Sequence, residues 1–240
     1  MKAFNKYFDH TLLKPDATDI QILKLATEAV TYDLAAVCVN GCHVRSVRQF
    51  LNTFDSDVKV AAVVGFPLGA MSTCAKAAET RIAIGDGADE IDMVINIGAV
   101  KDRNMDYVKD EIASLAEICH GTLSLSGEPV VLKVIIETCL LTDDEIVDVT
   151  KIIMAAGADF VKTSTGFAED GATVHGVSVI KAAIDDHAAA TGIAPVGIKA
   201  SGGIRTLEDA RAMIESGADR LGCSSSINIL SELDEEHQKA

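Results

Sequence analysis

The chain has 240 residues, of which 48% are hydrophobic and 24% are charged. This composition is typical of globular proteins, and the length suits one large domain, which we expect to span residues 1–240. The formal net charge of −15 argues against nucleic acids and anionic membranes as partners, because both would repel the protein. An anionic small molecule stays compatible with this charge if it binds in a local pocket of positive charge.

The sequence shows no signal peptide, membrane-spanning segment or zinc-binding motif. Residues 1–14 lack the apolar stretch of a signal peptide, and no apolar run has the length needed to span a bilayer. Cys38, Cys42 and His43 lie close together, but they do not form the two ligand pairs of a structural zinc site. The sequence therefore predicts a cytoplasmic protein with reduced thiols and no metal site.

A repeated junction organises the chain. The tripeptide Gly-Ala-Asp occurs at residues 87–89, 157–159 and 217–219, each time after a helical pattern and before an apolar run. The glycine is typical of the left-handed residue that follows a helix, and the apolar run predicts a strand. Successive junctions are about two helix–strand units of roughly 30 residues apart. The chain therefore has room for eight units, the number in a single (β/α)8 TIM barrel.

Eight segments are predicted to be strands, with helices between them. Several are apolar runs without strict alternation, which is typical of parallel strands that are covered on both faces. Thr142 and Glu145 predict a capping box at one helix start, and Thr206 begins another helix. A helix is expected to end before Gly192, and residues 232–240 are expected to be a frayed tail. The predicted strands are residues 8–12, 35–40, 58–65, 90–97, 130–137, 160–165, 196–201 and 220–224.

Lys162 lies within the stretch of residues 159–167, which begins as an apolar strand and leads into small hydroxyl residues and a glycine. Burying a lysine in a strand is costly unless its amine is used. A desolvated amine loses its proton readily and attacks a carbonyl to form a Schiff base. The alternative is a lysine that reaches solvent past the end of the strand or pairs with a carboxylate.

Strand alternation places three more charged residues beside Lys162. With Lys162 facing the barrel interior, Lys199, Lys133 and Asp92 also face inward, while the outward positions are apolar or small. Two neighbouring ammonium groups disfavour each other's charge, so the pKa of Lys162 or Lys199 should fall. Asp92 would stay ionised and exchange protons. The alternative, a buried salt-bridge network of Asp92 with Lys133 and Lys199, is expected to hold in part as well.

Glycines and serines follow three of the predicted strands. Gly202 and Gly203 follow strand seven, Ser224 and Ser225 follow strand eight before a short helix, and Gly166 follows strand six. Loops after strands seven and eight, together with a helix N-terminus, form the recurrent phosphate site of this barrel. The sequence therefore predicts a phosphate site next to the lysines.

Five ordered motifs together make the chain resemble the deoxyribose-phosphate aldolase family of class I aldolases. The resemblance implies reversible cleavage of 2-deoxy-D-ribose 5-phosphate to acetaldehyde and D-glyceraldehyde 3-phosphate through a lysine Schiff base, within deoxyribose and nucleotide catabolism. It implies no cofactor, because the iminium replaces a metal, and it implies a homodimer. The motifs are residues 9–15 (DHTLLKP), 90–94 (EIDMV), 132–138 (LKVIIET), 161–166 (VKTSTG) and 199–206 (KASGGIRT).

The resemblance also implies a role for each matching residue. Lys162 matches the Schiff-base lysine, Lys199 the second lysine that perturbs it and takes part in proton transfer, and Asp92 the aspartate that exchanges protons. The phosphate-binding positions are Gly166, Gly202, Gly203, Ser224 and Ser225, and Asp9, Cys38 and Lys133 match supporting positions in the pocket.

One departure leaves the preference for phosphorylated substrates open, since Phe167 stands where some members carry a lysine. Two other functions also remain compatible with the sequence. The first is another phosphosugar barrel that uses Lys162, such as a transaldolase or a ketose-phosphate aldolase. The second is a non-catalytic barrel that binds a sugar phosphate as a sensor, which would keep the glycine and serine loops but would not need Lys162 beside Lys199.

Overall fold

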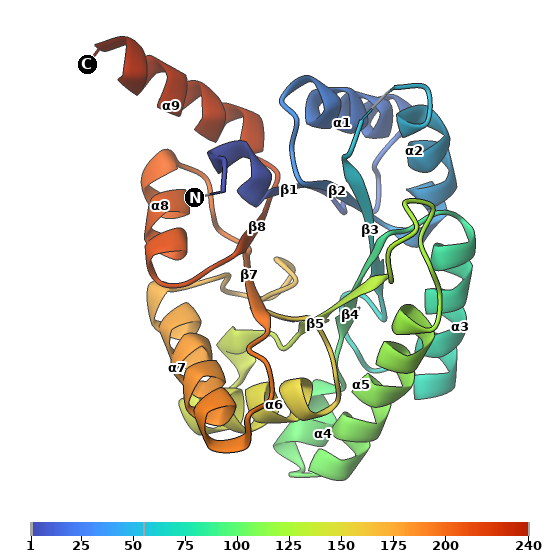
Figure 1. Ribbon diagram of the computed structural model, residues 1–240, viewed down its shortest axis with the longest axis vertical. Helices are drawn as coiled ribbons and strands as arrows, with labels where there is room; N and C mark the ends of the chain where they lie inside the picture. The colour runs from blue at the N-terminus through green and yellow to red at the C-terminus, as the bar shows by residue number, and fades with distance from the viewer. Residues whose placement is uncertain (1, 55, 240) are drawn as a thin grey trace.

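Short apolar strands alternate with capped helices along the chain, and each strand pairs in parallel with the next. The computed structural model describes residues 2–54 and 56–239. The last strand pairs with the first, so the sheet closes into an eight-stranded parallel barrel (Figure 1). The strands are β1 (Phe8–Leu12), β2 (Ala36–Val39), β3 (Lys59–Val64), β4 (Glu90–Val94), β5 (Val131–Ile135), β6 (Phe160–Lys162), β7 (Gly197–Ser201) and β8 (Arg220–Cys223).

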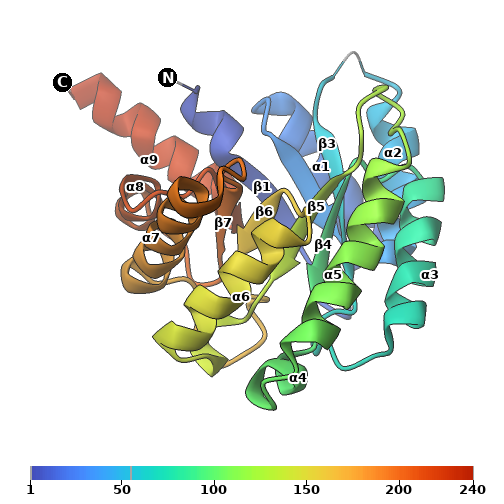
Figure 2. The same cartoon turned by 60° about the horizontal axis from the view of Figure 1, so that its bottom comes forward.

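Most of the helices stand outside the barrel and cover the outer faces of its strands, while the last helix extends away from it (Figures 1 and 2). Among the described residues, three short 3₁₀ helices precede the first strand or lie in later connections: η1 (Phe4–Tyr7), η2 (Gly41–His43) and η3 (Thr138–Leu140). The α-helices are α1 (Asp19–Thr31), α2 (Val44–Leu51), α3 (Thr73–Gly85), α4 (Ile97–Lys101), α5 (Met105–His120), α6 (Asp143–Ala155), α7 (Val174–Thr191), α8 (Leu207–Glu215) and α9 (Ser226–Lys239). This architecture confirms the predicted (β/α)8 TIM barrel.

Helix boundaries follow local side-chain chemistry. Thr142 and Thr206 cap α6 and α8 with reciprocal hydrogen bonds to the third helical residue, as capping boxes do. The glycine of each Gly-Ala-Asp junction has a positive φ, namely 106° at Gly87, 84° at Gly157 and 113° at Gly217. Each of these glycines follows a helix and turns the chain into the next strand.

All eight predicted strands are present, although several are shorter than predicted. The segment predicted at residues 130–137 forms a strand only to Ile135, because Glu137 takes a left-handed conformation that breaks the extended backbone. The segment predicted at residues 160–165 stops at Lys162, where the chain begins its turn toward α7. The prediction of a frayed tail was wrong for most of its length, since α9 continues to Lys239.

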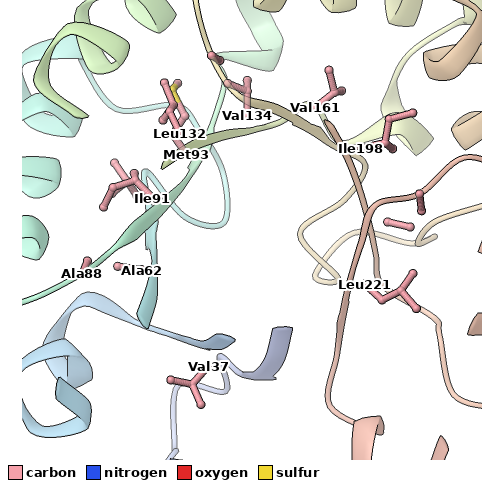
Figure 3. Packing of buried hydrophobic residues seen from close by; sticks show 14 of the residues in the cluster. Val37, Ala62, Ala88, Ile91, Met93, Leu132, Val134, Val161, Ile198 and Leu221 are labelled. Carbon is pink, nitrogen blue, oxygen red and sulfur yellow. The ribbon is translucent and has the colours of Figure 1, made fainter. Parts of the chain in front are cut away.

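The main apolar core lies between the strands and the helices. Figure 3 shows side chains such as Met93, Val134 and Ile198 pointing from their strands toward the helix layer. These are the alternate positions that the sequence predicts to face outward. Their burial accounts for the apolar runs and leaves the other half of each strand free to face the interior of the barrel.

The interior of the barrel has an apolar part and a charged part. Cys38, Ala61 and Val63 on β2 and β3 pack together with Leu13 and Phe66. The charged part is made by the inward positions of the remaining strands, and its members are Asp9, Glu90, Asp92, Lys133, Lys162, Lys199 and Arg220. A barrel core is usually filled by branched apolar side chains, so the charged part is the candidate functional region.

Two glycines let the connections after β6 and β7 touch. A Cβ atom built on Gly171 would lie 2.2 Å from the carbonyl oxygen of Gly202, and one built on Gly202 would lie 2.9 Å from Cα of Gly171. The amide of Ala172 donates hydrogen bonds of 3.0 Å to the carbonyls of Ser201 and Gly202. The absence of side chains at both glycines therefore permits a backbone contact that joins the two loops.

Gly171→Ala is expected to lower the free energy of unfolding by about 1–3 kcal/mol, because the added methyl group must push the two loops apart. Gly85→Ala is the matched control, since a Cβ atom there meets nothing within 4 Å. It should leave stability unchanged or raise it by up to about 1 kcal/mol. Urea denaturation of both variants measures the difference, and equal stabilities would contradict the predicted clash.

Candidate active site

Asp92 lies at the centre of the charged part of the barrel interior. Its Oδ1 atom accepts a hydrogen bond of 2.8 Å from Lys133 Nζ. Its Oδ2 atom accepts one of 2.8 Å from Lys162 Nζ and one of 2.6 Å from Lys199 Nζ. The backbone register places Lys162 beside Lys199 on β6 and β7, and Asp92 beside Lys133 on β4 and β5. The three predicted catalytic residues therefore meet at one carboxylate.

Two further carboxylates and a guanidinium complete this network. Lys199 Nζ lies 2.5 Å from Asp9 Oδ2, and Lys133 pairs with Glu90. Arg220 binds Asp9, with a hydrogen bond of 2.7 Å from its Nε atom, and lies 3.2 Å from Glu90. Arg220 and Glu90 were not predicted as site residues. The alternation along residues 220–224 would have identified Arg220, because Leu221 and Cys223 belong to the core outside the strands.

The charges of this network balance when Lys162 is neutral. Its carboxylates are those of Asp9, Glu90 and Asp92, and they match the cations of Lys133, Lys199 and Arg220 in number. Burial lowers the pKa of Lys162, the positive charge of Lys199 lowers it further, and attraction to Asp92 opposes both effects without reversing them. The network thus provides a buried amine that loses its proton more readily than an ordinary lysine.

The other two lysines are held in their charged form. Burial alone would lower the pKa of Lys199, but Asp9 and Asp92 outweigh this effect and raise it. The pKa of Lys133 is also raised, because Asp92 and Glu90 outweigh the effect of burial. Burial alone would raise the pKa of Asp92, yet the three lysines hold it well below its usual range. Asp92 is therefore ionised at neutral pH.

Cys38 lies at the border between the charged and the apolar parts of the interior. Its Sγ atom is 3.9 Å from Asp92 Oδ2, and its side chain packs against Ala61 and Val63. Burial raises the pKa of the Cys38 thiol. Cys38 is thus a protonated, buried neighbour of the network, whereas Cys42 is exposed.

A cleft of about 310 Å³ opens above the network at the carboxyl ends of the strands. Lys162 lies at its base, and the cleft also contains Lys14 and Arg205 but no carboxylate among its described lining. A cation-lined cleft in a chain with a net charge of −15 suits an anionic ligand. The lining residues are Thr11, Leu12, Leu13, Lys14, Lys162, Thr165, Gly166, Phe167, Ser201, Gly202, Gly203, Ile204, Arg205, Gly222, Cys223, Ser224 and Ser225.

The five residues predicted to bind phosphate all line this cleft. Gly166, Gly202 and Gly203 have φ values of 82°, 84° and 81°, so each turns the chain in a way that favours glycine. Ser224 and Ser225 directly precede α9, whose first residues offer backbone N–H groups. The lining of the cleft thus combines glycine turns, hydroxyl groups and a helix N-terminus.

A buried histidine fixes the start of α9. His10 Nε2 lies 2.9 Å from a carboxylate oxygen of Glu28, and His10 Nδ1 lies 3.2 Å from the hydroxyl oxygen of Ser226. Burial lowers the pKa of His10, and the hydrogen bond with Glu28 opposes this effect. This chain of hydrogen bonds links α1, β1 and the residue that follows Ser225.

Lys14, Arg205 and Gly222 belong to the site, although they were not predicted as site residues. Lys14 and Arg205 were part of the quoted motifs, and their loops follow the first and seventh strands. All loops at the carboxyl ends of parallel strands meet at one face, which would have identified both cations. Gly222 faces the interior, where an added Cβ atom would lie 2.9 Å from Cε of Lys199.

Within residues 2–54 and 56–239, no group of three or more His, Cys, Asp or Glu side chains is arranged to hold a metal ion. Across the same described part of the chain, no helix combines the length and apolar character needed to cross a membrane.

Sequence comparisons match nearly the whole barrel. A model of the DeoC/LacD family of aldolases matches residues 4–232, a range that includes every candidate residue named above. A deoxyribose-phosphate aldolase of Finegoldia magna is 51% identical over 226 residues, which are 94% of this chain and 98% of that protein. A deoxyribose-phosphate aldolase of Thermococcus gammatolerans is 49% identical over 225 residues, which are 94% of each chain.

Solved structures extend the similarity to the fold. A deoxyribose-phosphate aldolase of Aeropyrum pernix, described as tetrameric, superimposes with a TM-score of 0.84 at 28% identity, covering 96% of this chain and 91% of that one. An aldolase called QR15 superimposes with a TM-score of 0.85 at 38% identity and covers 99% of each chain.

Asp92→Asn is expected to lower the free energy of unfolding by about 3–5 kcal/mol, because it leaves buried lysines without their shared counter-charge. Asp185→Asn is the matched control, since Asp185 pairs with Lys181 on the exposed face of α7. Its effect should stay below about 0.5 kcal/mol. Urea denaturation at pH 7 compares the two variants, and a small loss for Asp92→Asn would contradict the central role of this carboxylate.

Lys199→Met is expected to raise the pKa of Lys162. It removes a positive charge that lowers the Lys162 pKa, and it frees Asp92 to stabilise the Lys162 ammonium. In the wild type, the Lys162 amine should deprotonate below its ordinary pKa of 10.5 as the pH rises. NMR titration of 15N-lysine-labelled protein measures this midpoint, with Lys162→Met to assign the signal. A midpoint that falls or stays unchanged in Lys199→Met would contradict the proposed coupling.

Proposed function

The chain belongs to the DeoC/LacD family of aldolases, and we propose that it reversibly cleaves 2-deoxy-D-ribose 5-phosphate to acetaldehyde and D-glyceraldehyde 3-phosphate. One observation carries this proposal. Lys162, a buried lysine with a lowered pKa, lies at the base of a cation-lined cleft and contacts Asp92, which also binds Lys199. A neutral amine, an acid–base pair and a positive cleft are what a Schiff-base aldolase of a sugar phosphate requires.

We assign the nucleophilic step to Lys162. Its neutral Nζ atom attacks the C1 aldehyde of the open-chain sugar and forms a C–N bond. The resulting carbinolamine loses its C1 oxygen as water and becomes an iminium. The positively charged iminium then serves as the electron sink beside C2.

Carbon–carbon cleavage follows from this electron sink. Loss of the proton from the C3 hydroxyl group converts C3 to an aldehyde, and the C2–C3 bonding pair moves into the enamine. D-Glyceraldehyde 3-phosphate leaves, C2 of the enamine takes up a proton, and water hydrolyses the iminium. These steps release acetaldehyde and regenerate Lys162.

Proton exchange is assigned to Asp92 together with Lys199. The very low pKa of Asp92 makes this carboxylate a weak base by itself. Its Oδ2 atom contacts both Lys162 Nζ and Lys199 Nζ, so a proton can pass between the lysines and a water molecule through one short path. Three neighbours support this arrangement. Asp9 pairs with Lys199, and Lys133 and Cys38 both contact Asp92.

The phosphate group is assigned to the opposite end of the cleft. Backbone N–H groups at Gly166, Gly202 and Gly203 and the hydroxyl groups of Ser224 and Ser225 would bind its oxygens. Lys14 and Arg205 line the same cleft and would contribute positive charge. These contacts would hold C1 over Lys162 and draw an anion to a protein that is negatively charged overall.

Aldolases of this family are class I enzymes, so the proposed reaction needs neither a metal nor another cofactor. The Lys162 iminium supplies the electron sink that a Lewis acid would otherwise provide. The homodimeric state and the cytoplasmic location implied by the sequence remain predictions.

The proposed function predicts that acetaldehyde and borohydride together leave an ethyl group on Lys162. Mass spectrometry of the digested protein locates the adduct, and Lys162→Ala should lose it. The rate of 2-deoxy-D-ribose 5-phosphate cleavage, measured as acetaldehyde release, should fall by at least about a thousandfold in Lys162→Ala.

Other outcomes would point to other functions. An adduct on Lys199 would exchange the roles of the two lysines. Cleavage of longer ketose phosphates without acetaldehyde chemistry would indicate a transaldolase or ketose-phosphate aldolase. Binding of a sugar phosphate by the folded protein, with neither an adduct nor turnover, would indicate a sensor.

A further inference from the structure

Glu137 combines two unfavourable features next to Thr165, a residue that lines the cleft. It follows β5, and its φ of 55° and ψ of 68° place it in the left-handed region, which a residue with a side chain adopts at a cost. Its side chain is also buried, with 2% of the residue exposed. Strain of this kind persists where the surrounding structure holds it, and it is concentrated at functional sites.

The carboxylate of Glu137 also lacks an ion-pair partner within the described residues. Every other buried carboxylate there pairs with a cation, as Asp89 does with Arg48 and Glu111 does with Lys76. Burying a carboxylate without a counter-charge is costly unless hydrogen bonds replace the lost water. The contacts of Glu137 therefore indicate what keeps the carboxylate in this position.

Those contacts lead directly to the turn after β6. The Glu137 carboxylate accepts hydrogen bonds from Thr165, at 3.1 Å from the backbone nitrogen and 2.5 Å from the hydroxyl group. The Thr165 hydroxyl oxygen in turn accepts a hydrogen bond of 3.1 Å from the backbone nitrogen of Phe167. Thr165, Gly166 and Phe167 all line the cleft.

This chain of hydrogen bonds occupies two of three consecutive N–H groups. The N–H groups of Thr165 and Phe167 are bound, whereas that of Gly166 has no acceptor among the residues that the structure describes. Gly166 itself has a φ of 82°, in the region that favours glycine. The free N–H group of Gly166 is thus presented by a turn that Glu137 holds in place.

We propose that Glu137 is a positioning residue that holds the turn of residues 165–167, so that the Gly166 N–H group binds the phosphate of the substrate. The inference rests on the proposed function and assigns Glu137 no part in the chemistry at Lys162. Loss of the Glu137 carboxylate should therefore weaken binding of the phosphorylated sugar and leave the reaction of the lysine unchanged.

Glu137→Gly tests this role, because glycine accepts the positive φ while removing the carboxylate. The KM for 2-deoxy-D-ribose 5-phosphate should rise about tenfold, the change expected when one hydrogen bond to a charged group is weakened. The kcat/KM for unphosphorylated 2-deoxy-D-ribose and the rate of acetaldehyde trapping on Lys162 should change less than about twofold. Glu137→Gln keeps one acceptor oxygen and should show a smaller rise in KM.

Two more variants complete the experiment. Thr165→Val removes the hydroxyl group between Glu137 and Phe167 and should raise the same KM. Glu145→Gln is the matched control, because this buried carboxylate caps α6 and pairs with Lys101, outside the lining of the cleft. It should leave the KM for the phosphorylated sugar unchanged.

An unchanged KM in folded Glu137→Gly protein would overturn the inference. Equal losses for the phosphorylated and the free sugar would also overturn it, since they would indicate a general structural role. If Glu137→Gly does not fold, the Glu137→Gln and Thr165→Val variants decide between the same outcomes. Failure of the wild type to cleave either sugar would instead refute the proposed function.

Discussion

One carboxylate shared by three lysine side chains determines the electrostatics of the barrel interior. Asp92 binds Lys133, Lys162 and Lys199 where water is excluded, so each charge depends on its neighbours instead of on solvent. Asp9 and Glu90 keep two of the lysines charged. Lys162 has Asp92 as its carboxylate partner and is left to lose its proton. The same interaction therefore stabilises the interior and prepares one amine for reaction.

Side chains alternate along each strand between the apolar core and the charged interior of the barrel. Outward residues pack against the helices and form the large apolar core, while inward residues can be charged because they meet one another. The parallel direction of all strands brings their connections to one face, where glycine turns and serines surround the entrance above Lys162. Each loop can then contribute a polar group to one cleft without disturbing the core.

Strand periodicity was sufficient to predict the fold and the central residues. The outward positions around Lys162, Lys199 and Asp92 are apolar, so alternation alone places these three side chains in the interior. The role of Glu137 could not be predicted, because it depends on a left-handed backbone conformation and on contacts with the turn after β6. The contact at Gly171 likewise arises only when two loops meet. Such features depend on tertiary geometry, which local sequence patterns do not contain.

An ion pair joins the first and the last strand of the barrel, so the network depends on residues near both ends of the chain. Arg220 on the last strand binds Asp9 on the first, across a separation of 211 residues. Asp9 also binds Lys199, so the electrostatic environment of the reactive amine is complete only after β8 has emerged and closed the ring. The surroundings that lower the pKa of Lys162 therefore exist only in the closed barrel.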